Sequence, residues 1–104
     1  MMVLHIEAAD FDQAVKIAEA LLSKKLIYDV SFFKADKFTP LQNGDANEGE
    51  KTFLSAKSKS ILYHSIEEEL KLMLGENMPT MFSQPIIQMP TEQFAAIRSE
   101  TEKL

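Results

Sequence analysis

Hydrophobic and polar positions follow two different spacings along this chain. Alternation or a β-rich composition, both typical of strands, occurs over residues 2–8, 26–38, 51–58 and 81–89. Apolar residues at three- and four-residue steps, typical of amphipathic helices, occur over residues 10–25, 60–75 and 91–104. The resulting order predicts an α+β fold of the split βαβ kind, with an antiparallel four-stranded sheet, two helices on one face and a short C-terminal helix.

Single residues mark several ends of these segments. Asp10 has the side chain of a helix N-cap, and Gly75 stands where a C-terminal glycine would end the second long helix. Asn43 and Gly44 form a dipeptide that favours a tight hairpin turn between the second and third strands. Pro85 cannot donate a hydrogen bond to a neighbouring strand, so the fourth strand is expected at the edge of the sheet or at a bulge.

The apolar stripes of the two long helices predict the core between helices and sheet. They are Ala14, Ile17, Ala18, Leu21 and Leu22 in the first helix and Leu62, Ile66, Leu70 and Met73 in the second. In the second strand, Ile27 and Phe33 share the face that alternation places away from both helices. Because two helices cover only one face of such a sheet, we expect a second copy of the chain to cover these two residues.

Composition places the chain among ordinary globular proteins. With 104 residues it is expected to form one domain, residues 1–104. The net charge of −5 and a pI near 5.0 do not suit binding to nucleic acid or to an anionic membrane. There is no cysteine, which excludes disulfides and thiolate chemistry. The first residues lack the basic segment of a signal peptide and no apolar run is long enough to span a bilayer, so we expect a cytoplasmic protein.

The residues that could carry chemistry do not form a recognisable catalytic set. His5 and His64 are available for acid–base or metal chemistry, but no carboxylate lies beside either at a ligand spacing. Glu67–Glu69 occupy three successive helical positions, which diverge around the helix and are expected to face solvent. The segment 43–48 has some acidic and amide side chains but lacks the order of a calcium-binding loop. No glycine-rich phosphate loop or nucleophile motif is present, and the chain is expected not to be an enzyme.

Three groups of residues, in their order and spacing over residues 3–90, resemble the CutA divalent-ion tolerance family. One is the apolar pattern Ala14-x-x-Ile17-Ala18-x-x-Leu21-Leu22-x-x-x-Leu26, which is similar to the family's first helix. Another is Lys57, thirteen residues after Gly44. The last is Pro79 followed by Pro85-Ile86, as at the start of the family's fourth strand.

The resemblance implies a ferredoxin-like sandwich that assembles as a homotrimer and a role connected with divalent metals. The family's His-Pro-Tyr-Glu-x-Pro motif is altered: Leu74, Gly75, Glu76 and Asn77 stand at its first four positions. Asp29 replaces the family's cysteine and Gln42 its tryptophan. The candidates that remain for a metal are Glu76, Met78 and Met81, which combine a hard carboxylate with soft thioethers and match no single metal. No cofactor is expected.

The sequence is therefore interpreted as a divergent CutA-like protein that acts as a non-enzymatic, homo-oligomeric binding or scaffold module, with weak binding of divalent metal at most. A trimeric PII-like sensor that binds a small anion or nucleotide between subunits is the first alternative. A small dimeric α/β-barrel enzyme using His5 or His64 is the second.

Overall fold

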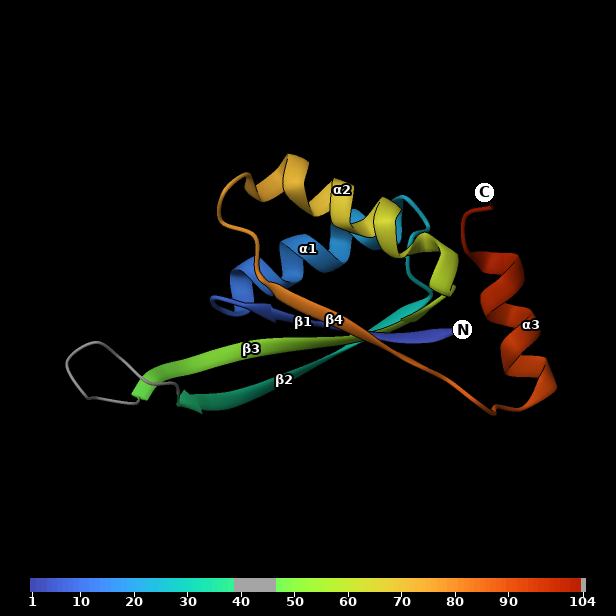
Figure 1. The fold of residues 1–104 in the computed structure, drawn as a ribbon, viewed down its shortest axis with the longest axis horizontal. Helices are drawn as coiled ribbons and strands as arrows, with labels where there is room; N and C mark the ends of the chain where they lie inside the picture. The colour runs from blue at the N-terminus through green and yellow to red at the C-terminus, as the bar shows by residue number, and fades with distance from the viewer. Residues whose placement is uncertain (39–46, 104) are drawn as a thin grey trace.

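The fold is a four-stranded antiparallel sheet with two helices on one face. The computed structural model describes residues 1–38 and 47–103, with only the backbone of residues 47 and 48. Its elements in chain order are β1 (Met2–Ala8), α1 (Phe11–Ser23), β2 (Asp29–Phe38), β3 (Asn47–Ser58), the 3-10 turn η1 (Ser60–Leu62), α2 (Tyr63–Leu74), β4 (Thr80–Pro85) and α3 (Thr91–Glu100). The strand order is β2-β3-β1-β4. Both long helices lie on the same side of the sheet and α3 stands beyond its end (Figure 1), which confirms the predicted ferredoxin-like fold class.

Helix α1 begins as its sequence predicts. The Asp10 side chain accepts a hydrogen bond from the Gln13 backbone N–H at 2.8 Å. The Gln13 side chain in turn accepts one from the Ala9 N–H at 2.7 Å. Two backbone donors that the helix itself leaves unpaired are thereby satisfied, which is the function of a reciprocal N-terminal cap.

The end of α1 is a Schellman turn centred on a lysine. The Lys25 N–H donates to the Leu22 carbonyl at 3.0 Å, and the Leu26 N–H donates to the Leu21 carbonyl at 2.9 Å. This pair of hydrogen bonds requires a left-handed residue between them, and Lys25 supplies it with φ of 56°. The turn leaves the Lys25 carbonyl free to accept a hydrogen bond from another part of the chain.

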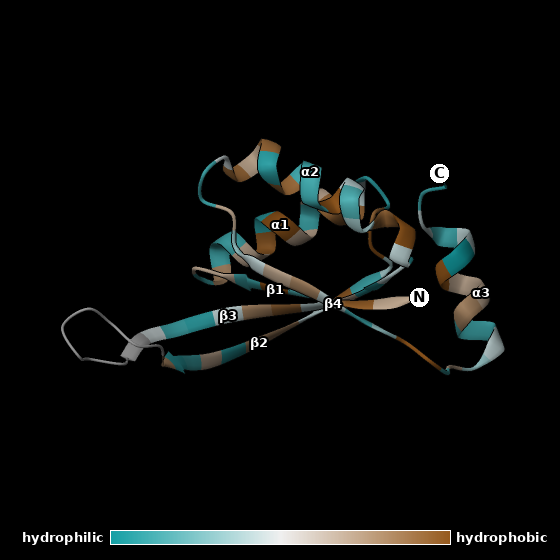
Figure 2. Ribbon diagram, viewed as in Figure 1, coloured by the Kyte–Doolittle hydropathy of each residue, from teal (hydrophilic) through white to brown (hydrophobic). Residues whose placement is uncertain are grey.

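The core lies between the sheet and the two long helices. Every second residue of β1 is buried, and so are Ala14, Ile17, Ala18 and Leu21 of α1 and Ile66 and Leu70 of α2. Figure 2 shows brown hydrophobic segments alternating with teal polar ones along both helices. Each predicted stripe includes one residue that is not buried: Leu22 in α1 is 41% exposed and Met73 in α2 is 38% exposed.

The prediction for Ile27 is wrong. Ile27 is 2% exposed and belongs to the core of its own chain, so no second copy is needed to cover it. The reason is that β2 begins only at Asp29. Residues 26–28 form a connection in which Leu26 and Ile27 are both buried, so strand alternation cannot be extended back to them. Phe33, inside the strand, is 57% exposed as predicted.

β4 is an edge strand, paired only with β1. It ends at Pro85, four residues before the end of the predicted segment 81–89. Pro85 is paired with Met2, the first residue of β1, and the Ile86 N–H donates to the Met1 carbonyl at 3.0 Å, so pairing stops where the partner strand begins. The hairpin turn predicted at Asn43 and Gly44 lies outside the described residues.

Helix α3 is attached to the rest of the molecule at its C-terminal end. Ile97 is its buried side chain. Beyond the helix, the Glu102 N–H donates to the Lys25 carbonyl at 2.7 Å. The Lys59 ammonium donates to the carbonyls of Thr101 and Glu102 at 3.2 and 2.9 Å. The Schellman turn and the end of β3 therefore both hold this segment in place.

Candidate functional site

The three residues considered for metal binding lie in the connection between α2 and β4 and at the start of β4. Glu76 is exposed in the connection between α2 and β4. Met78 and Met81 are partly buried and pack against the hydrophobic core. Their thioethers therefore fill space beside the core, a common use of methionine.

A shallow pocket of about 410 Å³ lies beside Met78. Its wall includes Glu7, Lys51, Asn77 and Met78. Glu7, its single acidic residue, already forms an ion pair with Lys37 at 2.8 Å. Asn77 contributes an amide side chain to this wall.

The two histidines lie on different layers of the fold. The His5 ring stacks on Phe82 with centroids 4.8 Å apart, and its Nε2 lies 2.8 Å from Oε1 of Gln84. The His64 side chain is 89% exposed on α2, with Nδ1 3.5 Å from a Glu67 carboxylate oxygen. The structure does not bring them together. The expectation that no carboxylate lies beside either histidine is wrong for His64, because Glu67 follows it by three residues, on the same face of α2.

The three successive glutamates do not all face solvent. Glu69 has a side chain only 14% exposed and forms an ion pair with Lys24 of α1 at 2.7 Å. The expectation of a solvated face holds for Glu68, which is exposed, and fails for Glu69 because the end of α1 packs close by.

Within residues 1–38 and 47–103, no three or more His, Asp or Glu side chains converge closely enough to hold a metal ion. We therefore expect calorimetry with Cu²⁺ or Zn²⁺ to show no saturable submicromolar site, because a mixed set of carboxylate and thioether suits neither ion. The double variant Met78→Leu with Met81→Leu should give the same titration as the native chain. One ion bound tightly per chain, and lost in the double variant, would contradict this expectation.

The sheet face opposite the helices carries an aromatic surface. Phe33 of β2 lies opposite Phe53 of β3, and His5 of β1 lies opposite Phe82 of β4. Phe33 and Phe82 are 57% and 52% exposed. We call these four residues the open-face aromatics.

Ion pairs lie toward the two ends of the open-face aromatics. Glu7 pairs with Lys37 toward the β2–β3 hairpin, and Asp29 pairs with Lys57 toward the opposite end, each at 2.8 Å. An apolar, aromatic centre with charged residues around it is the usual composition of a protein–protein interface.

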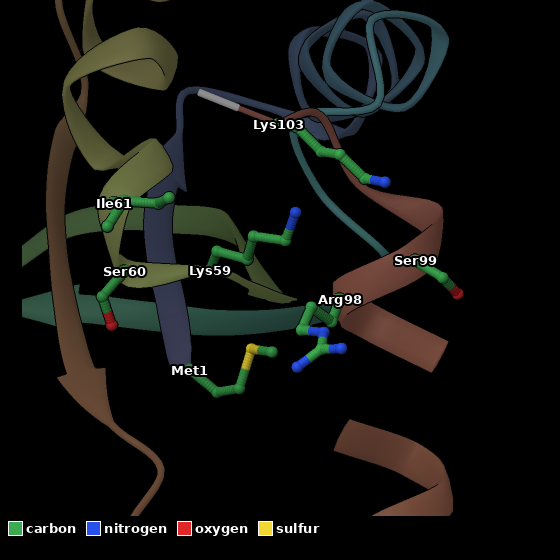
Figure 3. A pocket seen from close by; sticks show the side chains of 7 residues that line it. All are labelled: Met1, Lys59, Ser60, Ile61, Arg98, Ser99 and Lys103. Atoms are coloured by element: carbon green, nitrogen blue, oxygen red, sulfur yellow. The ribbon is translucent and has the colours of Figure 1, made fainter. Parts of the chain in front are cut away.

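A cavity that is open to solvent, and that the sequence pattern did not indicate, lies between Met1, η1 and α3. Its volume is about 610 Å³. It is lined by Met1, Lys59, Ser60, Ile61, Arg98, Ser99 and Lys103. Figure 3 shows Lys59, Arg98 and Lys103 around it, Lys59 next to η1 and the other two in α3 and just beyond it. Lys59 is distant in sequence from Arg98 and Lys103, and those two are not adjacent, so no run of basic residues points to the three.

None of the helices in the described part of the chain combines the length and apolar composition needed to cross a bilayer. No protein-family model matches the chain, and no curated protein sequence matches it either.

Solved structures match it over nearly its whole length. CutA1 from Pyrococcus horikoshii is 16% identical with a TM-score of 0.88, covering 99% of this chain and 100% of that one. CutA from Archaeoglobus fulgidus, described as a periplasmic divalent cation tolerance protein, is 25% identical with a TM-score of 0.87. The match covers 98% of this chain and 100% of that one. CutA1 from Oryza sativa is 16% identical with a TM-score of 0.82, and the match covers 99% of this chain and 94% of that one. The chain thus has the fold of the CutA divalent cation tolerance proteins.

Proposed function

We propose that the chain is a divergent CutA-like protein that acts as a homotrimeric, non-enzymatic binding or scaffold module linked to divalent-metal tolerance. The observation that carries the proposal is the fold match, which spans 94–100% of the neighbouring chains quoted above. Those neighbours are named for CutA or for tolerance of divalent cations rather than for a reaction. In this proposal the metal motif of the family is lost and the protein resides in the cytoplasm.

The open-face aromatics support the proposal of a homo-oligomer. Exposed phenylalanines on a sheet face without a helical cover are costly in water, and packing against neighbouring copies of the chain would bury them. Phe33 and Phe82 supply the apolar area, and the ion pairs Glu7–Lys37 and Asp29–Lys57 remain on either side of it.

Light scattering during size-exclusion chromatography tests the assembly. We expect a mass of about three times the 11.8 kDa of one chain at micromolar concentration, because every copy of the chain carries the proposed contact surface. A dimer would instead favour the α/β-barrel alternative. A monomer across the same concentration range would contradict the homo-oligomer.

Metal tolerance is tested separately from assembly. A strain that lacks the gene should grow less well in elevated copper, and the native chain should restore growth. Restoration by Met78→Leu with Met81→Leu is expected as well, since the proposal assigns those residues to packing.

A further inference from the structure

We propose that the cavity lined by Lys59, Arg98 and Lys103 binds a phosphorylated small organic anion. This site is separate from the open-face aromatics and from the segment of the metal motif. It is lined by Met1, by residues at and after the end of β3, and by residues in and after α3.

Lys59 is the first element of the site. It is only 9% exposed, yet its ammonium group has backbone carbonyls as partners, at 3.2 Å on Thr101 and 2.9 Å on Glu102. An ammonium has three donors, so one hydrogen remains beyond these two contacts. A buried cation without a counter-ion is costly, and an anion in the cavity would offset that cost.

Arg98 and Lys103 add two further cations to the same wall. Among the described residues, no Asp or Glu forms an ion pair with Lys59, Arg98 or Lys103. Within the described part of the chain, the lining includes no acidic side chain. In a chain of net charge −5, three cations gathered with no acidic side chain among the described lining residues create a local positive potential that attracts anions. The Arg98 guanidinium can bind two phosphate oxygens at once, as arginine commonly does.

The rest of the wall indicates what else the ligand contains. Met1 and Ile61 provide apolar surface, and Ser60 adds a hydroxyl. The volume of about 610 Å³ lies within the range of small-molecule pockets, roughly 300–1,000 Å³, and exceeds what a lone phosphate requires. A ligand that joins a phosphate group to an apolar or aromatic part would contact both the cationic and the apolar residues of this lining.

Isothermal titration calorimetry with AMP, ribose 5-phosphate, adenosine and inorganic phosphate tests the proposal. We expect saturable binding of at least one of the two phosphorylated organic compounds, with one site per chain. Adenosine, which has no charge, should not bind, and inorganic phosphate should bind more weakly than the better organic ligand. The affinity should fall as salt is raised, because charge contacts dominate.

The double variant Arg98→Gln with Lys103→Gln should weaken this binding roughly tenfold or more, the loss expected when charge-assisted hydrogen bonds are removed. The matched control is Lys16→Gln with Lys71→Gln, which removes the same charge from exposed positions on α1 and α2. It should bind like the native chain. Circular dichroism melting confirms that both variants are folded. Absence of saturable binding by either phosphorylated compound, or equal loss in both double variants, would overturn the proposal.

Discussion

Replacing Leu21 with alanine should lower the free energy of unfolding by about 2–5 kcal/mol, the cost of emptying a fully buried leucine site. Leu21 is 0% exposed and lies on the face of α1 that packs against the sheet. Urea denaturation at one fixed protein concentration measures the change, since assembly makes the apparent stability of a homo-oligomer depend on concentration.

Leu22→Ala is the matched control for that experiment. Leu22 is the next residue, has the same side chain and is 41% exposed. Its replacement should cost well under half as much, because little apolar surface leaves the core and no enclosed cavity forms. Equal losses for the two variants would show that the inward face of α1 has been assigned wrongly.

Phe33→Asp should dissociate the proposed trimer into folded single chains. Within one chain Phe33 is 57% exposed, so a carboxylate there meets solvent and the fold should tolerate it. In the trimer the same carboxylate would be buried without a partner, at a cost of roughly 3–5 kcal/mol for each copy. Light scattering measures the mass, and circular dichroism measures the fold.

Leu72→Asp is the control for the assembly experiment. Leu72 is 83% exposed on α2, which covers the other side of the sheet. The same substitution there should leave the oligomeric mass unchanged. A Phe33→Asp chain that keeps the native mass would exclude the open-face aromatics from the subunit contact.

Most of the fold could be predicted because its local signals agree. β1 alternates over its full length, and α1 has both an apolar stripe and the cap formed by Asp10 and Gln13. Such patterns depend only on residues close together in the sequence, so they can be recognised from the sequence alone. The failure at Ile27 arose where no local signal separates a connection from a strand: Leu26 and Ile27 are both apolar, and only packing against the core decides where β2 begins.

The candidate sites were less predictable because they depend on contacts between distant segments. The environment of Met78 and Met81 follows from their place beside the core, and no spacing pattern reveals it. The cationic cavity combines a residue at the end of β3 with residues in and after α3. Only the docking of α3 brings them together, so a search for runs of basic residues passes over them.

Helix α3 should be released from the rest of the chain more easily than α1. Ile97 is the buried side chain of α3, whereas α1 buries four, so releasing α3 exposes little apolar surface and costs far less than unfolding the whole chain. The cavity exists only in the docked form, since Arg98 and Ser99 belong to α3. A ligand bound there would raise the population of that form. Ligand binding in the cavity would thus determine how much of the time the C-terminal segment is docked, and that position is what a partner protein would detect.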